Sequence, residues 1–162
     1  MSTAMIFAAV ATLLGSALIG GVFFAFSTFI MKALGRLTPA AGITAMQSIN
    51  IVVLNPRFLG MFMGTTALSV LVGAHSAIHW QAPSSPWFLA GAAFYFVGTF
   101  LVTGLGNVPL NNRLAGLSTA DPAAARFWEH YLDRWTFLNT VRTTGAMIAA
   151  ALFATGLIVQ SS

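Results

Sequence analysis

Four long apolar segments constrain this 162-residue chain more than any other feature. They cover about residues 4–31, 58–77, 87–105 and 141–159. Each is close to the roughly 20 helical residues that cross a bilayer, and none alternates as a β-barrel strand does. The first is too long for a signal-peptide core, and no basic segment precedes it. The sequence predicts an all-α fold, a four-transmembrane-helix bundle that forms a single integral membrane domain over residues 1–162.

Composition excludes several other classes of protein. Only 6% of the residues are charged and 57% are hydrophobic, whereas a soluble domain carries about 25% charged residues. The chain is therefore predicted to have the lipid bilayer as its partner. A sequence pI of 10.8 reflects the scarcity of acids and does not indicate nucleic-acid binding. The absence of cysteine excludes disulfides, thiolate metal sites and cysteine nucleophiles.

Two Thr/Asp-Pro pairs predict helix starts outside the spans. Thr38-Pro39 predicts an uncharged amphipathic helix over about residues 39–54, lying in the membrane interface or against the bundle. Asp121-Pro122 predicts a helix that continues through the fourth span to about residue 158. At 1.5 Å per residue this helix is roughly 55 Å long, so its first turns project from the membrane.

The charged residues predict the orientation. All seven basic residues lie in or beside the connections 32–57 and 106–140, and the connection 78–86 has none. The positive-inside rule places these two connections in the cytoplasm and both termini outside, in the cell (inner) membrane. The basic residues are Lys32, Arg36, Arg57, Arg113, Arg126, Arg134 and Arg142.

Small residues in the first span predict one helix contact. Ala17, Gly21 and Ala25 recur every four residues, which lets two helix backbones approach closely in lipid. The alternative is that alanine and glycine are simply common in such segments.

Six asparagines share the charged side of the membrane. Topology does not require this, because amides are neutral, and a buried amide costs several kcal/mol unless it finds a partner. The amides predict either a network that ties helices together or a polar pocket. They are Asn50, Asn55, Asn107, Asn111, Asn112 and Asn139.

One face of the long fourth helix carries a stripe of functional side chains. Its members are spaced by three or four residues: Trp128, Tyr131, Trp135, Asn139 and Arg142. One interpretation is an interfacial aromatic belt with Arg142 reaching the headgroups. The other is a flat aromatic pocket wall with Asn139 and Arg142 at its floor.

Two histidine patterns suggest further chemistry. His130 and Asp133, beside Glu129, are close enough on a helix to form a general base, although a solvated face of the projecting helix also accounts for them. His75 and His79 have the spacing of metal or haem ligands, but a helix end with interfacial histidines also accounts for them.

The chain resembles the anthrone oxygenase-like family (DUF1772) over nearly its whole length. The resemblance is carried, in order, by GVFFAFSTFIMKAL, AMQSINIVVLNPRF, GNVPLNNRLA and YLDRWTFLNTVRT. It implies a four-helix membrane protein that oxidises a planar hydrophobic phenolic or polyketide substrate with O2. Characterised fungal relatives oxidise anthrones to anthraquinones without metal, flavin or haem, so no cofactor is expected.

This resemblance, combined with the residues above, predicts a site. Trp128, Tyr131 and Trp135 would stack the rings, and Asn107, Asn139 and Arg142 would hydrogen-bond the developing oxyanion. His130 and Asp133 would accept the proton, while Asn55 and Asn111 would shape the pocket. Two alternatives remain: a non-catalytic membrane module that binds a lipid, quinone, other hydrophobic ligand or partner protein, and a haem or metal protein that uses His75 and His79.

Overall fold

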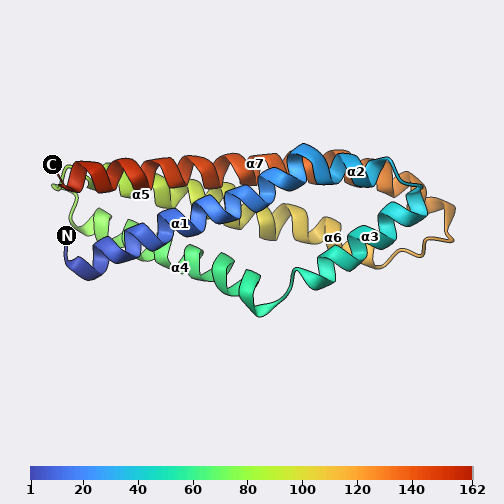
Figure 1. The fold of residues 1–162 in the computed structure, drawn as a ribbon, viewed down its shortest axis with the longest axis horizontal. Helices are drawn as coiled ribbons and strands as arrows, with labels where there is room; N and C mark the ends of the chain where they lie inside the picture. Colours follow the sequence, from blue (N-terminus) through green and yellow to red (C-terminus); the bar gives the residue numbers. More distant parts are fainter. Residues whose placement is uncertain (162) are drawn as a thin grey trace.

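The computed structural model describes residues 1–161, which form helices joined by short turns (Figure 1). Four helical rods have the length and apolar composition to cross a membrane: Thr3–Gly35, Pro56–Ile78, Ser85–Ala115 and Pro122–Ser161. The predicted all-α, four-span fold is therefore confirmed. In chain order the elements, with η denoting π-helix, are α1 (Thr3–Ala25), η1 (Phe26–Ile30), α2 (Met31–Gly35), α3 (Pro39–Val52), α4 (Pro56–Ile78), α5 (Ser85–Tyr95), η2 (Phe96–Leu101), η3 (Thr103–Asn107), α6 (Val108–Ala115) and α7 (Pro122–Ser161).

The rods close into a four-membered bundle. Both α7 and α4 pack against α1 and α5, so each rod has two neighbours. Both termini and the turn between α4 and α5 lie at one end, and α2, α3, α6 and the start of α7 lie at the other (Figure 1). The connections that carry the charged residues are thus at a single end of the bundle.

Large apolar side chains cover the outside of the rods. Phe7 is 71% exposed, Leu14 62%, Ile78 80% and Leu105 78%. Water would penalise so much exposed apolar surface, whereas lipid tails accept it. Together with the four spans, this surface identifies an integral membrane protein.

The third rod extends further than the sequence predicts. The expected span ends near residue 105, but the helix continues to Ala115, so the third connection contains only residues 116–121. Pro109 lacks an N–H, and in a regular α-helix its ring would clash with the carbonyl of Leu105. The wider π-helical turns of η3 lie directly before this proline and accommodate it.

The predicted helix between the first two spans is present as α3. It begins at Pro39, as expected, and ends at Val52. Gln47 Nε2 donates hydrogen bonds to the carbonyl oxygens of Leu114 (2.9 Å) and Leu117 (3.1 Å), which attaches α3 to the end of α6. The location of α3 relative to the membrane interface stays a prediction.

The small-residue stripe on the first span forms no close helix contact within residues 1–161. Ala17 and Gly21 are exposed, and a Cβ on Gly21 would meet nothing within 4 Å. A close backbone approach instead joins Gly98 of η2 to Gly145 of α7, where a Cβ on Gly145 would lie 2.9 Å from the Gly98 carbonyl carbon. Spacing of four identified small residues but not the face that they occupy.

This close approach gives a stability prediction. We expect Gly145→Ala to destabilise the bundle by about 1–3 kcal/mol, because the added methyl group meets backbone that cannot rotate away. Gly60→Ala is the control: it has open space around it and should be neutral or stabilising. Thermal unfolding in detergent measures both, and equal Tm values for the two variants would contradict the packing described here.

The orientation can be tested directly because the chain has no native cysteine. We expect a single cysteine at Ser118 to react with a membrane-impermeant maleimide only after the cells are opened. A cysteine at Gln81 should react in intact spheroplasts. Both positions are exposed in connections at opposite ends of the bundle. The reverse labelling pattern would refute cytoplasmic placement of the charged end.

Candidate functional site

Arg142 lies inside the bundle, only 4% exposed, on α7. Its Nη2 donates to Asn139 Oδ1 (2.5 Å) and its Nη1 donates to Thr103 Oγ1 (3.3 Å). The guanidinium carbon lies 4.0 Å from the ring centre of Phe23 and 5.2 Å from that of Trp135. Neutral acceptors and aromatic faces therefore hold this cation, the latter by cation–π attraction.

The charge of Arg142 has no counter-ion among the described residues. All three carboxylates of the chain are exposed, and none lies within ion-pair distance of the guanidinium. Its Nε is buried and makes no hydrogen bond. A buried, uncompensated charge is costly, and in a membrane span it marks a functional site by default.

Asn139 fixes the position of Arg142. Its side-chain nitrogen donates to the Phe23 carbonyl (2.6 Å) and to Ser27 Oγ (2.7 Å), which leaves its oxygen facing the guanidinium. Asn139 is fully buried. A single amide thus connects α7 to the junction of α1 and η1 and orients the cation.

Asn111 of α6 makes a second junction with α7. Its Oδ1 accepts hydrogen bonds from the Tyr131 hydroxyl (2.7 Å) and from Trp135 Nε1 (2.8 Å). Two donors on one oxygen define which way the amide faces. The Asn111 nitrogen is consequently directed away from them and makes no hydrogen bond with any described residue.

A cavity of about 290 Å³ lies in front of Arg142. Its wall is mainly apolar and combines aromatic with aliphatic side chains. Several of the rings pack together: Phe58 and Phe62 stack at 6.2 Å, as do Phe62 and Phe100 at 5.9 Å. Polar groups gather at one end, where Asn50 Nδ2 is buried and unpaired. The aromatic and polar side chains of the lining are Phe23, Phe26, Phe58, Phe62, Phe100, Asn50, Thr103, Asn111, Trp135 and Arg142.

The cavity reaches the outer surface of the bundle between α3, α4 and η3. Leu54, Leu59 and Met63 line it and are 65%, 37% and 51% exposed. Gly104 lines it from the opposite side and is also exposed. The mouth is therefore apolar and lies on the surface that contacts lipid.

Five of the predicted site residues meet at or beside this cavity. Arg142, Trp135 and Asn111 line it. Asn139 holds Arg142, and Asn107 donates from Nδ2 to the Trp135 carbonyl (3.2 Å). The interpretation of the stripe as a pocket wall thus fits Trp135 and Arg142, because both face the cavity.

The outer part of the stripe has a different location. Trp128 and Tyr131 do not line the cavity; they stack on each other at 5.6 Å, and Tyr131 stacks on Trp135 at 6.2 Å. Both belong to the hydrophobic core between α2, α3, α6 and α7. The structure makes them supports of Trp135 and Asn111 and gives them no contact with the cavity.

The structure does not bring His130 and Asp133 to the cavity. Both are exposed, and they line separate grooves, His130 beside Arg134 and Asp133 beside Lys32 and Arg36. Because the stripe on α7 faces the interior of the bundle, His130 and Asp133 lie on the outward faces of this helix. Among residues 1–161, His130 and Asp133 make no hydrogen bond to each other.

Asn55 is also outside the cavity. It caps α4: its side-chain oxygen accepts from the backbone N–H groups of Arg57 (3.1 Å) and Phe58 (3.0 Å). An Asn-Pro pair before a helix is the usual signal for such a cap.

The sequence did not predict the phenylalanines of the cavity wall or the hydrogen bond from Asn139 to Ser27. Phe23, Phe26 and Ser27 lie in the first family-like motif, yet an apolar span offers no local signal that distinguishes a cavity phenylalanine from a lipid-facing one. The π-helical turns η1, η2 and η3 border the cavity, and such turns frequently occur at functional sites.

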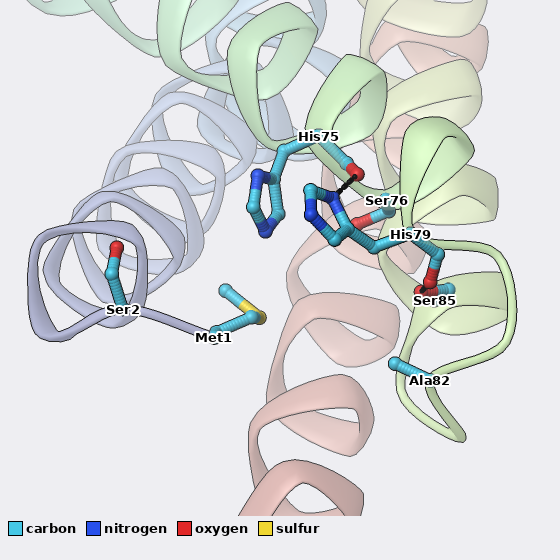
Figure 2. A pocket seen from close by; sticks show the side chains of 7 residues that line it. All are labelled: Met1, Ser2, His75, Ser76, His79, Ala82 and Ser85. Carbon is cyan, nitrogen blue, oxygen red and sulfur yellow. Dashed lines mark hydrogen bonds between the residues drawn. The ribbon is translucent and has the colours of Figure 1, made fainter.

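His75 and His79 do not line the cavity of Arg142; they lie beside the N-terminal residues Met1 and Ser2 (Figure 2). Their rings stack at 4.1 Å, and His79 Nδ1 lies 2.9 Å from the His75 carbonyl oxygen. Met1 and Ser2 line the same cavity of about 420 Å³. Residues 1–161 contain no cluster of three His, Cys, Asp or Glu side chains around these rings or elsewhere.

Comparison with protein-family models matches residues 53–152 to the anthrone oxygenase family. No curated protein and no solved structure matches significantly. The matched segment contains Asn107, Asn111, Trp135, Asn139 and Arg142, and it covers more than half of the sequence. The chain belongs to the anthrone oxygenase family.

Proposed function

We propose that the protein is a membrane-embedded, cofactor-independent oxygenase that acts on a planar hydrophobic phenol or polyketide and O2. The observation that carries the proposal is the cavity, in which an aromatic wall faces a buried cation and amide donors. Membership of the anthrone oxygenase family supports oxygenase-type activity. The charged end of the bundle would lie in the cytoplasm, in the cell (inner) membrane.

The wall suits a flat, fused-ring substrate. Phe58, Phe62 and Phe100 form a stacked series, and Trp135 adds a ring next to the polar end. Aromatic faces bind planar rings through dispersion and offset stacking. A lipid-facing mouth would admit both an apolar substrate and O2 from the bilayer.

The polar end suits an oxygen that gains negative charge. When an anthrone loses a proton from its central CH2, the charge moves onto the carbonyl oxygen across the ring. Arg142, with the free amide nitrogens of Asn50 and Asn111, would stabilise that oxyanion in a site of low dielectric constant. Because Asn139 already holds Arg142 in place, little reorganisation is needed.

The reaction balances without a cofactor. The carbanion transfers an electron to O2, and the resulting radicals combine into a C–O bond to give a peroxide anion. Breakage of the O–O bond and of the remaining C–H bond yields the ketone and hydroxide, which takes up the first proton. The CH2 group and O2 thus become C=O and water.

Activity depends on Arg142 and Asn139 in this proposal. We expect Arg142→Gln and Asn139→Ala to lower the rate of quinone formation from a model anthrone by about 10²–10³, as removal of an oxyanion donor does. Quinone absorbance and oxygen uptake by purified protein measure the rate. A rate no higher than the spontaneous background in wild-type protein would refute the proposed reaction and leave a module that binds a quinone or lipid.

His130→Ala and His79→Ala are informative partners in this experiment. The sequence pattern predicts that His130 is a base, whereas its exposed position outside the cavity predicts a nearly unchanged rate. His79→Ala should also retain the rate. Loss of activity in His130→Ala would return that residue to the mechanism, and loss in His79→Ala, with metal in the purified protein, would favour the metal hypothesis.

The mouth of the cavity gives a separate prediction. We expect Gly104→Leu to lower kcat/KM about tenfold or more, mainly through KM, by narrowing the route from the lipid. The new side chain has space and should not reduce stability. Gly60→Leu, also in open space but outside the cavity, is the matched control. Equal kcat/KM values in the two variants would argue against this route.

A further inference from the structure

The cavity around Arg142 is lined without a side chain that could take up a proton. Its lining contains one ionisable side chain, Arg142, and no Asp, Glu, His, Lys or Tyr. Tyr131 does not line the cavity, and its hydroxyl donates a hydrogen bond to Asn111. Within residues 1–161, elements α1, η1, α3, α4, η2, η3 and α6 direct no ionisable side chain into it. Nothing in the cavity can therefore act as a general base.

The hydrogen-bonding groups at the polar end are also unbalanced. Arg142 Nε and Asn50 Nδ2 are buried donors without an acceptor, and the Asn111 nitrogen makes no hydrogen bond. The one unpaired buried acceptor nearby within residues 1–161, Asn107 Oδ1, belongs to a residue that does not line the cavity. The amide oxygens of Asn111 and Asn139 are already occupied by protein donors. Buried donors usually have partners, and an acceptor atom on a ligand would supply one here.

The uncompensated charge of Arg142 also favours a ligand that brings an acceptor oxygen. Arg142 is buried without a counter-ion, and the Coulomb attraction that would compensate it is strong only inside the cavity, where the dielectric constant is low. A neutral ligand would satisfy the donors and leave the charge. An anionic oxygen would satisfy both.

We propose that the cavity selects its substrate as a preformed anion, the enolate or phenolate of a planar ketone or phenol, and that the protein supplies no base. This inference rests on the proposed function for the reaction but not for the binding. The substrate loses its proton to water, and its oxyanion binds to Arg142, Asn50 and Asn111. Burial of the aromatic rings against the phenylalanine wall adds affinity without discriminating between charge states.

Selection of an anion would also promote release of the product. Oxidation of the bound anion produces a neutral quinone and hydroxide, so the ion pair with Arg142 disappears when the product forms. The quinone retains the stacking contacts and loses the electrostatic one. It should therefore bind more weakly than the substrate anion and return to the lipid.

The binding claim can be tested with a ligand that cannot be turned over. 2-Hydroxyanthraquinone is planar, already oxidised, and changes colour when its phenol ionises. We expect the dye bound to the purified protein to ionise at least about one pH unit below the free dye in the same detergent. This corresponds to about tenfold preference for the anion.

Variants identify the charge responsible. Arg142→Gln should abolish the shift, and Arg142→Lys should keep part of it, because lysine retains the charge but loses the planar donors. Arg126→Gln removes an exposed charge on α7 outside the cavity and should leave the shift intact. Circular dichroism confirms folding. An unshifted or upward-shifted ionisation in wild-type protein, or a full shift in folded Arg142→Gln, would overturn the proposal.

Kinetics separate this inference from the proposed function. For two anthrones of different acidity, the pH at which kcat/KM rises should move with the acidity of the substrate. A rise at one fixed pH for both substrates would indicate a protein base and refute the inference while leaving the oxygenase intact. A shifted dye ionisation without any anthrone oxidation would instead support the anion site and refute the oxygenase.

Discussion

A single buried cation constrains how three elements of this bundle meet around the cavity. Removing a guanidinium from water inside a membrane protein costs several kcal/mol unless acceptors and aromatic faces replace the water. Arg142 receives these from three elements: Phe23 of α1, Thr103 of η3, and Asn139 and Trp135 of its own helix. Their meeting point requires α1 and the third rod to lie at fixed depth and rotation against α7. The cavity is the space that this arrangement leaves in front of the charge.

Two amides make the arrangement rigid in complementary ways. Asn139 joins the charge to the end of α1, and Asn111 joins Trp135 and Tyr131 to α6. In each case the amide oxygen is consumed by protein donors. What these two amides leave for a ligand is N–H groups beside a positive charge. Separately, the lining within residues 1–161 contains no Asp, Glu, His or Lys.

The π-helical turns explain how regular rods accommodate a cavity. One extra residue per turn rotates everything that follows by about 100° relative to a continuous α-helix. Phe26, Phe100, Thr103 and Gly104 all belong to such turns and all line the cavity. Without the π-helical turns, the apolar periodicity of these spans would direct a different set of side chains inward. Spacing alone failed to predict the buried face of the first span for a related reason. It does not define how the helix is rotated about its own axis.

The inward stripe on α7 shows where sequence reasoning works and where it stops. Helical periodicity correctly grouped Trp135, Asn139 and Arg142, because residues spaced by three and four share a face regardless of what they contact. It also grouped Trp128 and Tyr131 with them, although these residues reach only the hydrophobic core. Nearness along the chain made His130 and Asp133 candidates for a base, and α7 directs them outward. Asn55, selected as a motif residue, completes a helix cap.

The sequence by itself determined the class of protein, the number of spans, the single charged end and most of the α7 face. These properties follow from local quantities: the length of apolar runs, the scarcity of charge and the period of the helix. Only the tertiary structure decided that Phe23, Asn50, Phe62 and Thr103, from four different elements, surround Arg142. The reason is physical, because helix rotation and depth are set by contacts between segments far apart in the chain, and each apolar span read alone is compatible with many rotations in lipid.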